Sequence, residues 1–375
     1  MKKCIVISDS FKGTLSSLEI CGIARETVAE VFPDCQVVPV PVADGGEGTV
    51  ACFVEAIGAE PVTADVTGPY GEPVQAVYAR KGNLAVIEMA AAAGLPMVGQ
   101  RKDPESTTTY GVGLLIRHAV ESGCQEILLG LGGSATNDGG CGAAAALGVR
   151  FLDDDGREFV PVGKTLGRVA HIDVTAAKAL LAGTNVTAMC DVENPLCGPS
   201  GASSVFGPQK GADPEMVKRL DQGLASLAAV IRRDLGLDLA GCPGAGAAGG
   251  MGAGCMAFFS GTLKSGIEAV LDIVGFDSLL EEADLVITGE GRIDSQSVHG
   301  KVISGIARRT SPRNVPLVAI VGCIDPSAEA AYDLGVTAMF NIDREVQTFE
   351  QLAPNSAVNY RRTLRDVLRL IRPWA

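Results

Sequence analysis

The segment KCIVISDSFKG, residues 3–13 of the chain, indicates the fold class. Residues 3–8 form a short, β-rich apolar run, and the polar residues after it lead toward a helix predicted from about Ser16. Ser16 and Glu19 have the spacing of a capping box, in which two side chains satisfy free N–H groups at the start of a helix. A strand, a polar loop and a helix in this order are the building unit of an α/β protein.

The last third of the chain repeats this alternation. Strands are predicted at 285–288, 317–321 and 336–340, with helices from about 300 and near 327–334 between them. A final helix is predicted from the apolar positions Tyr360, Leu364, Val367, Leu368 and Ile371. Because parallel strands need crossover helices, we expect a doubly wound, Rossmann-like sheet built from both ends of the chain.

The middle of the chain departs from the alternation. After a strand at 36–42, three strands around 61–66, 74–79 and 84–88 follow without helices between them. Mixed helices and strands come next, at 108–121, 126–131, 138–147, 185–190 and from Asp213. A chain of 375 residues is also long enough for two domains. We therefore predict a discontinuous Rossmann-like domain, residues 1–65 plus 262–375, with a second α/β domain, residues 66–261, inserted in it.

The composition argues against several classes of function. The formal net charge is −13 and the pI about 4.8, and such a surface repels nucleic acids and anionic membranes. No apolar run is long enough to span a membrane. The 11 Cys residues contain no C-x-x-C pair, which suits a reducing compartment. We expect a globular cytoplasmic protein whose 47 Gly residues form tight turns or approach a ligand closely.

Polar loops follow five of the predicted strands, and four of these loops contain Gly. Because ligands of parallel α/β sheets bind at the carboxyl ends of strands, these loops are candidate binding segments. Gly lets backbone N–H groups converge on phosphate oxygens, while Asp, Ser, Thr and Lys supply metal ligands, hydrogen bonds and charge. The five loops are Ser8–Thr14, Asp44–Thr49, Gly132–Gly140, Asp191–Pro195 and Gly289–Asp294.

Each loop taken alone also has a structural explanation. Gly-rich turns are common, and Asn137 or Asp138 can cap a helix. No G-x-x-x-x-G-K-[ST] motif occurs, and Gly244–Gly249 fits G-x-G-x-x-G without a convincing strand before it. The three His residues form no zinc pattern, although a role for His299 at a site is left open. The residues alone therefore indicate an α/β protein that handles phosphates or other anions.

In their order along the chain, the loops resemble those of the type I glycerate kinase family. The resemblance covers nearly the whole chain and implies two α/β domains, one discontinuous and Rossmann-like, with the active cleft between them. It also implies phosphorylation of D-glycerate with ATP and Mg²⁺, 2-phosphoglycerate being favoured over 3-phosphoglycerate. The matching segments are Ser8–Gly13, Asp44–Thr49, Thr67–Gly71, Gly130–Gly140, Cys190–Gly198, Phe206–Gly211, Gly246–Gly254 and Thr288–Asp294 with Gly300-Lys301.

The resemblance further implies roles for the loop residues. A carboxylate should accept the proton of the substrate hydroxyl, and Asp191 leads Asp294 for this role. Both are also candidate Mg²⁺ ligands, and both have a structural explanation as caps of a turn or helix. The catalytic candidates are Asp191, Asp294, Lys12 and Arg292. The candidates for binding substrate or phosphate are Asp9, Ser10, Asp44, Gly45, Gly46, Gly132, Gly133, Ser134, Thr136, Asn137, Asn194, Gly289, Glu290, Gly291 and Lys301.

Other functions stay open on the sequence. The same loops suit an ATP-dependent kinase of another small hydroxy acid or polyol, or a non-catalytic sensor of small anions. A dinucleotide-dependent oxidoreductase is suggested only by Gly244–Gly249. The expected partners are glycerate and ATP, with no nucleic acid and no membrane. The sequence leaves open the oligomeric state, the position phosphorylated, and which loop binds which substrate.

Overall fold

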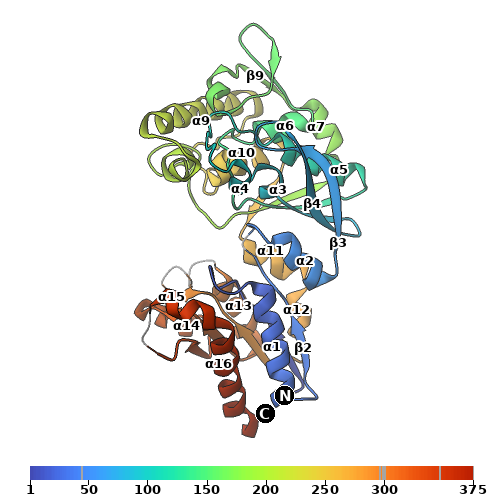
Figure 1. Cartoon of the computed structure of the whole chain (residues 1–375). Coiled ribbons are helices and arrows are strands. Elements are labelled where there is room, and N and C mark those ends of the chain that lie inside the picture. Colours follow the sequence, from blue (N-terminus) through green and yellow to red (C-terminus); the bar gives the residue numbers. More distant parts are fainter. Residues whose placement is uncertain (44, 295–296, 298–300, 346–347, 375) are drawn as a thin grey trace. The chain divides into compact units, whose positions relative to one another are not determined.

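The structure is a computed structural model, and it is described here for residues 1–43, 45–294, 297, 301–345 and 348–374. It is a mixed α/β protein with parallel sheets, as the sequence predicts (Figure 1). The chain forms two compact units. Unit 1 consists of Met1–Ala43, Ala51–Gly58 and Ser265–Ala375, and unit 2 of Asp44–Val50 and Ala59–Lys264.

Unit 1 is built on a parallel sheet with the strand order β16-β14-β12-β1-β2. From β1 the chain passes to β2 on one side, whereas β12 lies on the other side of β1 and is followed outward by β14 and β16. The order therefore reverses between β1 and β12, the position at which doubly wound sheets bind ligands. The strands are β1 (Lys3–Val6), β2 (Gln36–Pro39), β12 (Leu285–Thr288), β14 (Leu317–Val321) and β16 (Ala338–Asn341).

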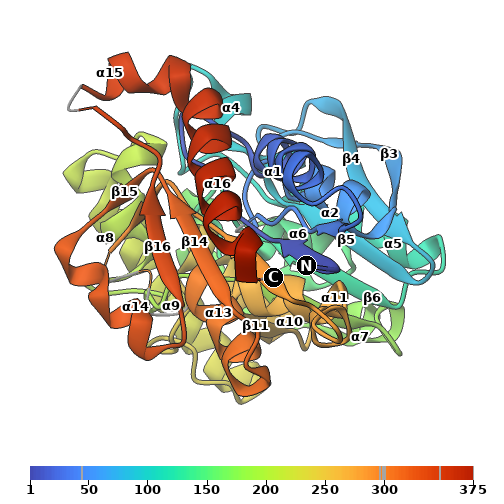
Figure 2. The same cartoon turned by 90° about the horizontal axis from the view of Figure 1, so that it is seen from below.

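The helices of unit 1 cover this sheet. The predicted capping box opens α1, where the Ser16 N–H donates to Glu19 at 2.8 Å and the Glu19 N–H donates to Ser16 at 3.2 Å. Helix α16 packs along α1, with an ion pair of 2.6 Å between Arg365 and Glu30 (Figure 2). The helices are α1 (Ser17–Val31), α11 (Gly266–Ile273), α12 (Phe276–Leu279), α13 (Val302–Thr310), α14 (Ala330–Asp333), α15 (Phe349–Leu352) and α16 (Ser356–Ile371).

Helix α2 and some short elements complete unit 1. Helix α2 (Thr49–Ile57) begins in the part of the chain that belongs to unit 2 and continues into unit 1. Strand β13 (Arg292–Ile293) pairs with β15 (Cys323–Ile324), so that the segments after β12 and β14 are hydrogen-bonded to each other. Short 3-10 turns are η3 (Ser311–Arg313), η4 (Pro326–Glu329), η5 (Ala353–Asn355) and η6 (Arg372–Trp374).

Unit 2 contains a six-stranded sheet with the order β11-β10-β6-β5-β4-β3. Strands β11, β10, β6 and β5 are parallel, and β4 and β3 extend the sheet in antiparallel fashion. The carboxyl ends of β6 and β10 are therefore neighbours. The strands are β3 (Glu60–Thr67), β4 (Pro73–Lys81), β5 (Leu84–Glu88), β6 (Glu126–Gly130), β10 (Asn185–Met189) and β11 (Thr262–Lys264).

Helices and a small second sheet surround this core. The predicted start of α9 is confirmed, because Asp213 caps it by accepting the Met216 N–H at 2.8 Å and Pro214 is its first residue. The helices are α3 (Ala90–Ala93), α4 (Leu95–Val98), α5 (Tyr110–Glu121), α6 (Cys141–Ala146), α7 (Thr175–Leu180), α8 (Ala202–Phe206), α9 (Pro214–Leu235) and α10 (Ala247–Phe258), with 3-10 turns η1 (Gly163–Arg168) and η2 (Pro208–Lys210). The second sheet has the order β8-β7-β9, from β7 (Arg150–Leu152), β8 (Glu158–Phe159) and β9 (His171–Asp173).

Candidate functional site

In unit 1, the loops after β1 and β12 are joined at the point where the strand order reverses. The carbonyl oxygen of Gly289 accepts the Asp9 N–H at 2.9 Å and the Ser8 hydroxyl at 3.0 Å. The Asp9 carboxylate in turn accepts the Ser10 N–H at 2.7 Å. The structure thus brings together two of the loops that the sequence singled out, Ser8–Thr14 and Gly289–Asp294.

Close backbone packing explains the first Gly of the second loop, Gly289. A Cβ atom on Gly289 would lie 2.1 Å from the carbonyl oxygen of Ile320 on β14, a distance that no side chain tolerates. A Cβ atom on Gly291 would lie 3.4 Å from the backbone nitrogen of Lys12. The loop after β12 is therefore held between the end of β14 and the first loop.

Glu290 is a buried carboxyl group within this loop. Its Oε1 atom has no hydrogen-bond partner in the part of the chain that the structure describes, while a hydrogen bond from Ser297 reaches the group. Burial raises its pKa to about 7, and the nearby Asp9 and Asp294 carboxylates contribute to the rise. A buried carboxyl with a free acceptor can bind a cation or a donor hydrogen, or carry a proton near neutral pH.

The charged residues after β12 differ in their surroundings. Arg292 is exposed, and its guanidinium pairs with Asp325 at 2.6 Å, beside the short β13–β15 ladder. The N–H of the half-buried Asp294 donates to Ser297 at 3.1 Å. Lys12 and Lys301 are exposed. His299 and Gly300 lie outside the described residues.

In unit 2, the segment Gly45–Thr49 packs against the loop after β6. The N–H of Gly132 donates to the carbonyl oxygen of Gly45 at 2.9 Å. A Cβ atom on Gly132 would lie 2.5 Å from the Cα of Gly46, so only Gly allows the two loops this approach. The carbonyl oxygen of Gly46 accepts the Thr49 hydroxyl at 2.8 Å. Asp44, the carboxylate predicted in this loop, lies outside the described residues.

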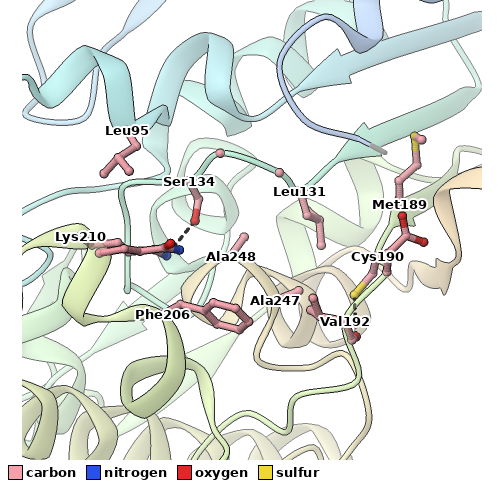
Figure 3. A pocket seen from close by; sticks show the side chains of 14 residues that line it. Leu95, Leu131, Ser134, Met189, Cys190, Val192, Phe206, Lys210, Ala247 and Ala248 are labelled. Atoms are coloured by element: carbon pink, nitrogen blue, oxygen red, sulfur yellow. Dashed lines mark hydrogen bonds between the residues drawn. The ribbon is translucent and has the colours of Figure 1, made fainter. Parts of the chain in front are cut away.

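A pocket of about 360 Å³ opens at the carboxyl ends of β6 and β10 (Figure 3). Among the predicted site residues, Gly132, Gly133, Ser134 and Asp191 line it. Asp191 lies two residues after the end of β10 and is exposed, whereas Ser134 is buried. The other lining residues are Leu95, Leu131, Met189, Cys190, Val192, Phe206, Gln209, Lys210, Ala247 and Ala248.

Lys210 is the charged lining residue of this pocket that the sequence predictions missed. Its side chain is buried, and its ammonium group donates to the hydroxyl of Ser134 and to the carbonyl oxygen of Thr136, both at 2.7 Å (Figure 3). Burial lowers the pKa of Lys210 to about 7, and the attraction of Asp138 opposes this fall. A signal was present, since Lys210 lies in the segment Phe206–Gly211.

Five predicted binding residues in the described part of unit 2 do not line the pocket: Gly45 and Gly46, which pack against the loop after β6, and Asn137, Asn194 and Thr136. Asn137 is fully buried and donates its amide to Ser203 at 3.1 Å. Asn194 donates to the carbonyl oxygen of Ser200 at 2.8 Å within its own loop. Thr136 is also fully buried and reaches the pocket only through its carbonyl bond to the Lys210 amine.

The G-x-G-x-x-G segment at Gly244–Gly249 lacks the context of a dinucleotide site. In the described chain it follows helix α9 and a turn, and it enters helix α10 through a left-handed kink at 248–250. A Cβ atom on Gly249 would lie 2.0 Å from the carbonyl oxygen of Thr136. This Gly therefore serves the packing of α10 against the loop after β6.

Comparison with known proteins gives matches along the whole chain. Residues 4–372 match the model of the glycerate kinase family. A protein named glycerate kinase from Bacillus cereus is 44% identical over 368 residues, 97% of each chain. One named glycerate 2-kinase from Escherichia coli K12 is 42% identical over 368 residues, again 97% of each chain. A crystal structure assigned as glycerate kinase 2 from Salmonella typhimurium LT2 superposes with a TM-score of 0.88 at 43% identity, covering 99% of this chain and 98% of the other.

Proposed function

The chain belongs to the glycerate kinase family, and from that premise we propose that it transfers the γ-phosphoryl group of ATP to a hydroxyl group of D-glycerate. The observation that carries the proposal is the pocket of unit 2, in which a glycine-rich loop, a carboxylate and a buried lysine meet. Phosphoryl transfer depends on positioning and on neutralising charge more than on covalent chemistry. A pocket with these groups supplies both.

The carboxylate proposed to accept the proton of the substrate hydroxyl is Asp191. It is exposed and lines the pocket together with Gly132, Gly133 and Ser134. A base must reach the hydroxyl that it deprotonates, and a carboxylate just beyond the carboxyl end of a parallel strand is placed for such a task. Asp294, in the loop after β12 of unit 1, is the second candidate, and its neighbour Glu290 keeps a buried oxygen without a partner among the described residues.

Mg²⁺ is proposed as the cation that accompanies ATP. The described residues contain no group of three or more His, Cys, Asp or Glu side chains arranged to hold a metal. Mg²⁺ bound to a nucleotide needs only one or two carboxylates beside phosphate oxygens and water, so Asp191 and Asp294 fit its chemistry as single ligands. The free oxygen of buried Glu290 fits a cation beside Asp294 as well. When bound, Mg²⁺ would neutralise phosphate charge.

The product proposed is 2-phosphoglycerate, because the relative from Escherichia coli is named glycerate 2-kinase at 42% identity. The reaction is proposed to take place in the cytoplasm. All 11 cysteines lie in the described part of the chain and none of them forms a disulfide, which suits a reducing compartment. No helix in the described part of the chain is long and apolar enough to cross a membrane.

Phosphorus NMR of the protein with ATP, Mg²⁺ and D-glycerate tests the proposal. We expect the ATP signals to decline while one phosphomonoester signal grows, and its position distinguishes 2-phosphoglycerate from 3-phosphoglycerate. Parallel samples with other small hydroxy acids and polyols should turn over much more slowly. ATP consumption no faster than in a sample without protein would overturn the proposal.

A further inference from the structure

Lys210 is a buried amine of unit 2 that forms no direct ion pair among the described residues, although the charge of Asp138 attracts it. Only 2% of its surface is exposed, and its amine donates to a hydroxyl group and a backbone carbonyl oxygen rather than to a carboxylate. The carboxylate of Asp138 attracts the charge of Lys210, but it accepts its hydrogen bonds from the N–H groups of Thr109, Gly140 and Gly142. A buried charge is costly unless a charged partner or several hydrogen bonds compensate it.

The position of the ammonium group suggests what its partner is. An ammonium group has three N–H donors, and two of them are directed to Ser134 and Thr136. Lys210 and Ser134 both line the pocket, and Figure 3 shows the lysine side chain lying along its wall toward the serine. The third donor is thus available at a wall that a ligand can reach.

The neighbouring groups are donors as well. The Ser134 hydroxyl accepts its bond from Lys210, so its own hydrogen is left to donate. Among the described residues, the backbone N–H groups of Gly133 and Ser134 make no hydrogen bond to other backbone groups, whereas the N–H of Gly132 is taken by Gly45. Convergent N–H and O–H donors beside a cation form a site for an anion.

A purely structural role for Lys210 does not explain why the buried residue is one that can carry a charge. If Lys210 only tied η2 to the loop after β6, an uncharged donor would make the same two bonds without the cost of a buried charge. The residue also lies on the wall of the proposed substrate pocket, where a negative ligand group would compensate its charge.

From this geometry we infer that Lys210 and Ser134 bind an anionic oxygen group of a substrate in the pocket of unit 2. The group is the carboxylate of glycerate or a phosphate of ATP, which present the same acceptor chemistry. The inference rests on the proposed function, because that function names the two anions.

Direct binding measurements with Lys210→Met test the inference. Titration calorimetry of the full chain would measure D-glycerate and ATP separately, beside the kinetics of turnover. We expect the affinity for one of them to fall about 10- to 100-fold, as for the loss of a hydrogen bond from a charged group, while the other changes little. A lower affinity for glycerate would identify its carboxylate as the group that Lys210 binds. A lower affinity for ATP would identify a phosphate.

Lys164→Met is the matched control. Its amine also donates to a serine hydroxyl, that of Ser106 at 3.1 Å, but it is exposed and does not line the pocket. We expect it to bind both substrates as the natural protein does. Circular dichroism would establish that each variant is folded.

Ser134→Ala keeps the test decisive if Lys210→Met does not fold. It removes the hydroxyl and leaves the charge, so we expect a fall of about 3- to 10-fold for the same substrate. Unchanged affinity for both substrates in a folded Lys210→Met variant, or in Ser134→Ala if only that variant folds, would overturn the inference. Failure of the natural protein to turn over glycerate would instead overturn the proposed function.

Discussion

The buried carboxylate of Asp138 accepts hydrogen bonds from both the backbone N–H and the hydroxyl of Thr109, at 2.8 and 2.9 Å. The N–H groups of Gly140 and Gly142 donate to it at 3.0 and 3.2 Å. Burial raises its pKa, and these hydrogen bonds oppose the rise. Because Asp138→Ala leaves all these donors buried without an acceptor, we expect the free energy of unfolding to fall by about 3 kcal/mol in urea titrations.

The control for this loss is an aspartate at the surface. Asp155 is exposed and pairs with the exposed Arg157, at 3.1 Å. Exposed pairs contribute little, so Asp155→Ala should change the free energy of unfolding by no more than about 0.5 kcal/mol. Equal losses at Asp138 and Asp155 would contradict the role given to the buried network.

The buried amine of Lys210 should make stability depend on pH. Its pKa is about 7 in the folded chain and 10.5 ordinarily. Between these values the unfolded chain holds the proton and the folded chain has lost it, so this group makes stability rise with pH, by about 1.4 kcal/mol per unit. The facing groups are Asp138, which attracts the charge, and Asp191 and Cys190 across the pocket.

The measurement compares two slopes. The free energy of unfolding of the natural chain and of Lys210→Met would be measured in urea between pH 7.5 and 9. Relative to the variant, the natural chain should become more stable by about 2 kcal/mol over this range. Lys164→Met, at an exposed position, should leave the slope of the natural chain unchanged. A constant difference between the natural chain and Lys210→Met would show that burial does not lower the pKa of Lys210 and that its amine keeps its proton in the folded chain.

Regular, apolar elements were predictable from the sequence alone. Strand Leu285–Thr288 agrees with its prediction residue for residue, because four apolar or β-branched residues stand between polar Asp284 and Gly289. Strand β2 ends at Pro39, earlier than the predicted 42, since Pro39 and Pro41 have no N–H to continue a ladder. The sheet β8-β7-β9 was missed because strands of two or three residues carry no detectable periodicity.

The candidate site was predictable in part, for a physical reason. Loops at the ends of parallel strands meet at one edge of a sheet, so the sequence placed Gly132–Ser134 and Asp191 near each other. The burial of Lys210 depends on how η2 packs against the loop that contains Ser134. That residue lies 76 positions earlier in the chain. Composition describes lysine as a surface residue, and only tertiary structure reveals the exception.

Arg292 should contribute to activity but little to stability. Its guanidinium is exposed and pairs with Asp325 on the surface, an interaction worth about 0–1 kcal/mol. If it balances the charge of a phosphate or of glycerate, Arg292→Met should lower kcat/KM about 100-fold, as measured in a coupled assay of ADP release. Arg150→Met removes an exposed pair with Glu158 and should leave turnover unchanged. Unaltered turnover in Arg292→Met would remove Arg292 from the site.

The variant Asp191→Asn distinguishes between Asp191 and Asp294 as the catalytic base. The amide has nearly the same shape but accepts no proton, so kcat should fall by about 100- to 10,000-fold if Asp191 is the base. Glu193→Gln changes an exposed carboxylate in the same loop and should leave kcat unchanged. If Asp191→Asn retains full kcat while Asp294→Asn loses it, the base is the carboxylate of unit 1.

Gly289→Ala tests the contact between the loop after β12 and strand β14. The added methyl would lie 2.1 Å from the carbonyl oxygen of Ile320 and 3.0 Å from the Ser8 hydroxyl, so backbone must move to admit it. We expect a loss of about 2 kcal/mol in the free energy of unfolding. Gly22→Ala in α1 adds the same methyl where nothing lies within 4 Å, and it should stabilise by about 0.5–1 kcal/mol. The Gly289 carbonyl oxygen also accepts hydrogen bonds from Asp9 and Ser8, so the Gly289→Ala variant should lose activity under conditions where it is still folded. Full activity of the folded variant would show that the loop tolerates the displacement.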